Sequence, residues 1–124
     1  MTYQDKIDIA VGHVMGWTGP RESEPYEQWD TPPAVRRVWD GGDVCREFDP
    51  DNYDDVMRLW FKFSNGRGTE LSHIEPKGAE HGWWYAEAVT SGFDTVWGED
   101  NDCCKAIIEC ILGDISYEKY HGKH

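Results

Sequence analysis

Basic residues are scarce in this chain of 124 residues: 12 Lys and Arg stand against 24 Asp and Glu, for a net charge of −12 at pH 7. Binding to free DNA or RNA relies on cations that neutralise phosphates, so we expect nucleic acid and anionic membranes to repel the protein. A basic protein surface would attract it and speed the encounter. The composition therefore favours a basic protein partner, unless the charge serves only solubility.

Long apolar runs are also lacking. No segment approaches the 18 or so apolar residues of a membrane helix, and residues 1–17 are neither basic nor apolar enough for a signal peptide. We therefore predict a soluble protein of the cytosol that makes no membrane contact. In that reducing compartment the four cysteines should be free thiols, namely Cys45, Cys103, Cys104 and Cys110.

The sequence lacks the motifs of metal sites and of catalysis. No two cysteines have the C-x2-C spacing of a zinc site, and Cys103 and Cys110 lie too far apart along one helical face to share an ion. There is no G-x-S-x-G motif, and no cysteine in a recognisable catalytic context. Gly66-Arg67-Gly68-Thr69 follows a helix and has few glycines, which favours a helix stop over a phosphate loop. We predict no enzyme, no metal and no cofactor.

Apolar residues at helical spacing predict three helices. The first covers residues 3–15 and can be capped by Thr2. The second covers 50–64, with Asp49 as N-cap and Pro50 at the first helical position. The third runs from about 102 to 112 and places its cysteines in the core, while residues 116–124 are expected to fray.

Three strands are predicted at 69–74, 83–89 and 93–97, and their short connections favour an antiparallel meander. Both faces of the middle strand are apolar enough to be covered. Residues 18–48 are rich in Pro and Gly and predict an irregular arm, packed on the body through Trp29 and Trp39, with a short helix at 34–39. The expected fold is one α+β domain over residues 1–124.

Four short patterns carry a family resemblance: Val14-Met15-Gly16-Trp17, Phe48-Asp49-Pro50, Gly82-Trp83-Trp84-Tyr85 and Cys104-Lys105-Ala106-Ile107. They resemble the phage ABA-sandwich domain family of small bacteriophage proteins, over most of the chain. The longer, more acidic 18–48 segment and the adjacent cysteines of the last helix depart from that pattern. The resemblance implies α-β-α layers and a phage origin, and it implies no catalytic residues.

Acidic residues are concentrated in segments 40–55 and 94–102. Carboxylates held on a rigid body can imitate a row of phosphates, although solubility and helix capping are alternative roles, notably for Asp49 and Asp102. We predict a partner-binding acidic surface made of Asp40, Asp43, Glu47, Asp51, Asp54, Asp55, Glu99 and Asp100.

These features together favour a small phage-encoded inhibitor that engages a basic surface of a host nucleic-acid-binding defence complex, such as a CRISPR effector. One alternative is a binder that captures a nucleotide second messenger in a pocket formed by Arg67, His81, Trp83 and Trp84. A phage accessory protein without inhibitory activity is a further alternative. Aromatic residues exposed by the arm could also form a homodimer face.

Overall fold

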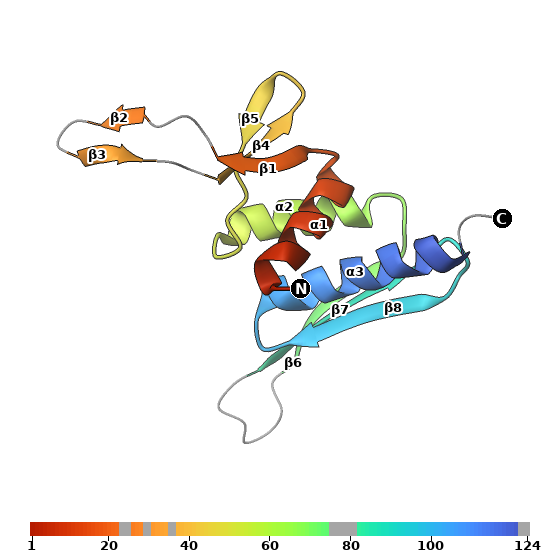
Figure 1. The fold of residues 1–124 in the computed structure, drawn as a ribbon. Helices are drawn as coiled ribbons and strands as arrows, with labels where there is room; N and C mark the ends of the chain where they lie inside the picture. Colours follow the sequence, from red (N-terminus) through yellow and green to blue (C-terminus); the bar gives the residue numbers. More distant parts are fainter. Residues whose placement is uncertain (23–25, 29–30, 35–36, 75–81, 122–124) are drawn as a thin grey trace.

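The computed structural model describes residues 1–22, 26–28, 31–34, 37–74 and 82–121 (Figure 1). In chain order the elements are α1 (Tyr3–Met15), β1 (Thr18–Glu22), β2 (Tyr26–Gln28), β3 (Thr31–Ala34), β4 (Arg37–Gly41), β5 (Val44–Arg46), α2 (Tyr53–Ser64), β6 (Thr69–Ile74), β7 (Trp83–Val89), β8 (Thr95–Asp100) and α3 (Cys103–His121). The strands form antiparallel sheets in the orders β6-β7-β8 and β1-β4-β5, and β2 pairs with β3. The predicted α+β class is confirmed.

Helix α1 spans the predicted residues because local capping defines both of its ends. The Thr2 hydroxyl accepts the Asp5 N–H, and the Asp5 carboxylate accepts the Thr2 N–H, which completes a capping box. Gly16 ends the helix in the left-handed conformation at φ 71°, where a side chain would be strained. The buried face of α1 consists of Ile7, Ala10 and Val11.

Helix α2 begins three residues later than the sequence predicted. Its N-cap is Asn52, whose side chain accepts the Asp55 N–H at 3.2 Å, so the prediction of Asp49 as N-cap is wrong. The Asp49 carboxylate instead accepts the Asp51 N–H at 2.9 Å, and the Asn52 N–H donates to the Asp49 carbonyl. Asp49 thus folds its own backbone into a turn, as Asp side chains often do, and the helix begins only after that turn.

Among the described residues, helices cover one face only of the β6-β7-β8 sheet (Figure 1), so the prediction that both faces of the middle strand are covered is wrong. Ala86 and Ala88 of β7 face the helices and are fully buried. Trp83 and Trp97 point to the opposite face and keep 49% and 58% of their surface exposed. Apolar residues on both faces of a strand normally indicate burial on both faces, and here the large aromatics remain in solvent.

The third strand of this sheet is shifted along the chain from the predicted 93–97 to Thr95–Asp100. Phe93 lies in a turn and has the left-handed φ of 65°. The Thr90 N–H donates to the Asp94 carbonyl at 2.7 Å, which closes that turn. A residue with positive φ cannot extend a strand, so pairing with β7 starts at Thr95.

Helix α3 continues to His121, so the predicted end near Leu112 is wrong, and residues 116–121, which were expected to fray, are helical in the structure. Residues 122–124 lie outside the described residues. Ile115 packs against the core, which extends the buried stripe of the helix by a turn. Tyr117 lies so close to Gly92 that a Cβ there would meet its hydroxyl at 2.0 Å. These contacts hold the last turns of α3 against the body.

Residues 18–48 are more regular than predicted, because β4 is the central strand of the β1-β4-β5 sheet. The predicted helix at 34–39 is therefore wrong. Trp39 of β4 is 2% exposed, packs into the core and lies 6.5 Å from the Trp17 ring. This contact confirms that the arm packs on the body through Trp39, whereas Trp29 lies outside the described residues.

The elements form successive layers, which Figure 1 shows from below upwards as the β6-β7-β8 sheet, α3, then α1 and α2, and the β1-β4-β5 sheet. The core between these layers is built around fully buried Ile107, Ile108, Ile111 and Leu59. All described helices lie on one side of the β6-β7-β8 sheet, which differs from the α-β-α order that the family resemblance implies. Its other face is left without a covering layer in the described part of the chain.

Candidate functional site

Two acidic segments that are far apart in the sequence approach each other at the start of α3. Burial raises the pKa of the Tyr3 hydroxyl, and so do its hydrogen bond to Cys104 and the negative charges of Asp102 and Asp51. Asp51 precedes α2 and Asp102 precedes α3, so one hydroxyl feels a carboxylate from each segment. Asp51 from the first segment and Asp102 from the second therefore lie near each other.

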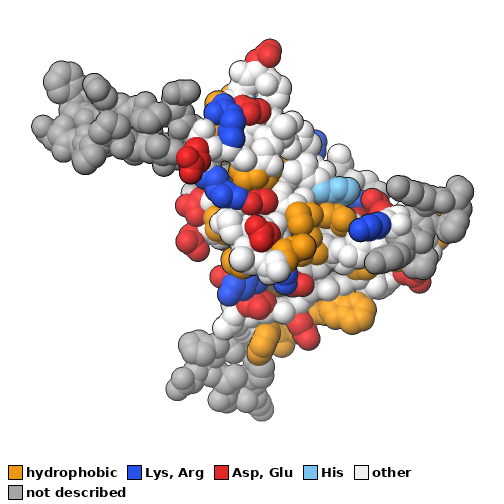
Figure 2. All heavy atoms as spheres, in the orientation of Figure 1, with side chains coloured by type: hydrophobic (Ala, Val, Ile, Leu, Met, Phe, Trp, Pro, Cys, Tyr) orange, Lys and Arg blue, Asp and Glu red, His pale blue; other side chains and the backbone are white. Residues whose placement is uncertain are grey.

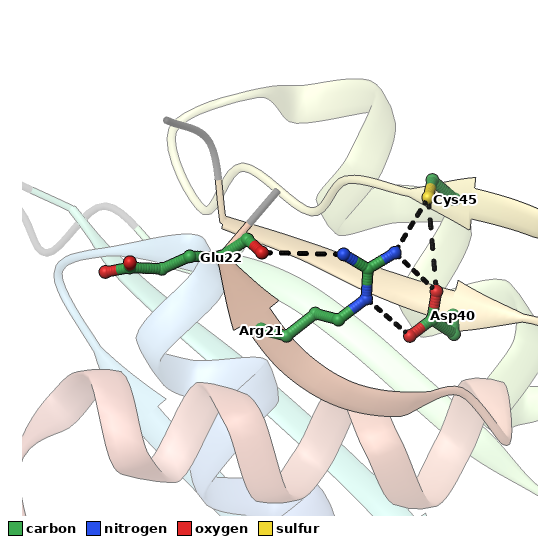
Figure 3. A network of polar contacts seen from close by, with 4 residues as sticks. All are labelled: Arg21, Glu22, Asp40 and Cys45. Atoms are coloured by element: carbon green, nitrogen blue, oxygen red, sulfur yellow. Dashed lines mark hydrogen bonds and ion pairs between the residues drawn. The ribbon is translucent and has the colours of Figure 1, made fainter. Parts of the chain in front are cut away.

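Asp40 is held in an internal ion pair that the sequence did not reveal. Its two carboxylate oxygens accept hydrogen bonds from Nε and Nη2 of Arg21 at 2.8 and 3.0 Å (Figure 3). These hydrogen bonds lower the pKa of Asp40. Arg21 Nη2 also lies 3.3 Å from the Cys45 sulfur. Asp40 thus anchors β1 to β4 and contributes less net charge to a partner surface than its position suggested.

Two further acids of the predicted surface stabilise the local backbone. The Asp55 carboxylate accepts the Asp49 N–H at 3.0 Å, and Asp100 accepts the Asp102 N–H at 3.0 Å. Asp102 in turn accepts the Lys105 N–H at 3.0 Å and caps the start of α3. The capping role considered for Asp102 is therefore confirmed, while Asp55 and Asp100 have structural roles that were not predicted.

The remaining acids of the predicted surface are exposed to solvent. Within the described part of the chain, four of their carboxylates have neither a hydrogen bond nor an ion pair, namely Asp43, Asp51, Asp54 and Glu99. Asp43 lies in the turn between β4 and β5, and Glu47 is exposed just after β5. Glu99 lies apart from the others, on the uncovered face of the β6-β7-β8 sheet. The exposed acids therefore fall in three places, namely the β4-β5 hairpin, the starts of α2 and α3, and the uncovered sheet face.

The described members of the alternative ligand pocket do not come together. Arg67 precedes β6, whereas Trp83 pairs with Ile74 at the other end of that strand, about 17 Å away along the sheet. Trp84 packs against the core, while Trp83 points to the uncovered face. His81 lies outside the described residues. The structure thus gives no single cavity in which Arg67, Trp83 and Trp84 could enclose a nucleotide.

Arg67 instead compensates a buried acid. Its Nη1 lies 2.9 Å from Oδ2 of Asp114, whose side chain is 1% exposed, and its guanidinium lies over the Phe63 ring at 4.3 Å. Neither oxygen of Asp114 accepts a well-aligned hydrogen bond in the described structure, so the contact is chiefly an attraction of charges. A polar hollow of about 370 Å³ lies beside Arg67. The guanidinium is thus committed to the fold.

The cysteines of α3 are packing residues. Cys104 and Cys110 are buried, and all four cysteines of the chain are free thiols. Burial is the main cause that raises the pKa of the Cys104 thiol to about 11 and that of Cys110 to about 12, which keeps both protonated and unreactive. Among the described residues, no group of three His, Cys, Asp or Glu side chains is placed to hold a metal ion.

The uncovered side of the β6-β7-β8 sheet, called here the open face, is a surface that the sequence analysis missed. Figure 2 shows hydrophobic and acidic side chains next to one another along the lower rim of the molecule, below this sheet. By strand alternation and register, the open face consists of Glu70, Ser72, Ile74, Trp83, Tyr85, Glu87, Val89, Thr95, Trp97 and Glu99. The one glutamate that each strand carries on this face, at Glu70, Glu87 and Glu99, was the available signal, because charged residues rarely point into a core.

No family model matches the chain, and neither a curated protein nor a solved structure is significantly similar to it. The resemblance to the phage ABA-sandwich domain family thus stays a prediction. In the part of the chain that the structure describes, no helix has the length and apolar character needed to cross a bilayer.

Proposed function

We propose that the protein is a binding protein whose acidic surface engages a basic surface of a nucleic-acid-binding complex. The observation that carries this proposal is that the exposed carboxylates of Asp43, in the β4-β5 turn, and of Asp51 and Asp54, at the start of α2, have no ion-pair partner within the described residues. Uncompensated charge of this kind attracts a basic surface over a distance and orients the encounter. The favoured partner is a host defence complex such as a CRISPR effector, met by a phage-encoded inhibitor in the cytosol.

The distribution of basic residues supports the same proposal. Among the described residues, four Lys and Arg side chains are engaged by acids, in the pairs Lys6–Glu109, Arg21–Asp40, Arg37–Asp8 and Arg67–Asp114. The excess of acidic residues therefore falls on carboxylates that stay exposed. Such carboxylates carry the charge sign of a phosphate row, and a channel that normally holds DNA would accept them in place of the nucleic acid.

The proposal is tested by displacement of DNA from a panel of bacterial defence complexes, including CRISPR effectors. Fluorescence anisotropy of a labelled DNA duplex reports whether the wild-type protein competes with it. The triple variant Asp43→Asn, Asp51→Asn, Asp54→Asn removes three charges from carboxylates that form no hydrogen bond or ion pair among the described residues. We expect about a tenfold loss of competition at about 50 mM salt and a smaller loss at about 200 mM, because salt screens the attraction.

A matched control removes the same number of charges elsewhere, through Glu22→Gln, Asp94→Asn and Glu118→Gln. This control should compete nearly as well as the wild-type protein if position matters as well as net charge. The proposal is wrong if the wild-type protein displaces DNA from no complex in the panel. It is also wrong if the triple variant at Asp43, Asp51 and Asp54 competes as well as the wild type.

A further inference from the structure

The open face alternates aromatic rings with carboxylates. Across the strands, Glu87 is paired with Trp97, and Tyr85 is paired with Glu99. Residues that are directly opposite in an antiparallel sheet have Cβ atoms about 5 Å apart. Each of these two rings therefore has a carboxylate as its immediate neighbour on the same surface.

The carboxylates are close enough to act on one group at the centre of the face. The pKa of Tyr85 is raised, first by burial and then by the negative charges of Glu87, Glu70 and Glu99. Within the described residues, Glu87 and Glu99 form no hydrogen bond or ion pair. The open face includes no Lys or Arg among its described residues. It therefore presents unneutralised carboxylates beside exposed aromatic rings.

This arrangement matches the chemistry of arginine. A guanidinium stacks on an aromatic ring and at the same time donates hydrogen bonds to a neighbouring carboxylate, and it is more weakly hydrated than a lysine ammonium. Trp and Tyr are also the residues most often found at the energetic centres of protein interfaces. The exposed Trp83, Trp97 and Ile74 would supply the apolar contact area for such a partner.

The spacing defines how the arginines would be arranged. The Glu87–Trp97 pair and the Tyr85–Glu99 pair occupy successive rows of one face, two residues apart along β7. Rows of this kind are separated by about 7 Å, which is also the distance between alternate residues of an extended chain. An extended segment lying along the strands would thus place every second side chain over one aromatic–carboxylate pair.

We propose that the open face binds an extended, arginine-bearing segment of a protein partner, with arginines at alternate positions over the Glu87–Trp97 and Tyr85–Glu99 pairs. The proposal rests on the proposed function, because it assumes a basic protein partner, and it adds a second contact surface with its own chemistry. A second copy of this chain is a poor occupant, since face-to-face docking would oppose carboxylates to carboxylates.

The test uses synthetic peptides with the full-length protein and follows tryptophan fluorescence and calorimetry. One peptide alternates arginine and serine, a second has the same composition with its arginines contiguous, and a third alternates lysine and serine. We expect the alternating arginine peptide to bind at least about fivefold more tightly than either of the others. Equal affinity of all three peptides would overturn the proposal, because charge alone would then explain binding.

Variants separate this surface from the acidic region around α2. Trp97→Ala and Glu87→Gln should each weaken binding of the alternating peptide at least about fivefold, with folding checked by circular dichroism. The triple variant at Asp43, Asp51 and Asp54 should change it less than about twofold, since screening limits distant charges. The reverse pattern would overturn this proposal alone. The proposed function fails separately, if the triple variant displaces DNA from a defence complex as well as the wild type does.

Discussion

Gly98 offers a sharp test of how closely α3 packs on β8. A Cβ at this position would meet the Ala106 carbonyl oxygen at 2.1 Å and the Cys110 backbone nitrogen at 2.7 Å. Ordinary contacts begin near 3.4 Å, so the helix backbone would have to retreat by about 1.3 Å, the difference between these two distances. Because the obstacle is backbone, no change of rotamer can relieve it.

We expect Gly98→Ala to lower the free energy of unfolding by about 3 kcal/mol, at the upper end of the usual range for overpacking. The midpoint of thermal unfolding should fall by roughly 10 °C for a chain of this size. Urea titration and thermal melts followed by circular dichroism measure both quantities.

Gly68→Ala is the matched control, because a Cβ there has its nearest neighbour, Val89, at 3.5 Å. Its free energy of unfolding should stay within about 1 kcal/mol of the wild-type value, since no clash has to be relieved. Equal stability of Gly98→Ala and the wild type would refute the close contact between α3 and β8. It would also remove the structural reason for placing Trp97 on the open face.

Three other outcomes are expected. Arg67→Met should lower the free energy of unfolding by about 3 kcal/mol, because it leaves the buried Asp114 carboxylate uncompensated, and adding Asp114→Asn should restore part of that loss; additive losses in urea titrations would contradict the pairing. A thiol reagent at neutral pH should label exposed Cys45 in the native protein, and Cys104 and Cys110 only after unfolding; rapid native labelling of all of them would contradict the packing of α3. The free energy of unfolding should be constant up to about pH 9 and fall above it. Thiols of the unfolded chain release protons near their ordinary pKa of 9.0, whereas burial raises the pKa of folded Cys104 to about 11 and that of Cys110 to about 12. A constant free energy of unfolding from pH 8 to 11 would contradict that burial.

Elements whose boundaries depend on local signals could be predicted from the sequence. Helix α1 has its capping box at Thr2 and its stop at Gly16, both within a few residues of the helix itself. The start of α2 was missed because two local interactions compete at the same place. Asp49 can cap a helix or close a turn, and the structure adopts the turn.

Elements that depend on distant partners were missed. Strand β4 pairs with β1 from Thr18↔Asp40 onwards, a contact between residues that no local pattern connects. The Arg21–Asp40 pair arises from the same register, so the sequence could identify Asp40 as acidic but not as neutralised. The last turns of α3 depend on contacts such as that between Tyr117 and Gly92.

The candidate site likewise has one part that could be predicted from the sequence and one part that depends on packing. Exposure of the acids at Asp43, Asp51 and Asp54 follows from their residue type and was predicted. The open face was not predicted, because the aromatic residues of β7 suggested that both faces of that strand are buried. Only the packing of α3 decides which face is covered, and with it which aromatic side chains stay accessible.

The most direct test of the central claim is the association rate constant with a defence complex from which the protein displaces DNA, measured by stopped-flow fluorescence at about 50 mM and about 200 mM salt. We predict that the wild-type rate falls steeply with salt, and that the Asp43→Asn, Asp51→Asn, Asp54→Asn variant associates about tenfold more slowly at low salt. The two rates should converge at high salt. Identical rates for the two proteins at both salt concentrations would contradict an acidic surface that recognises a basic partner.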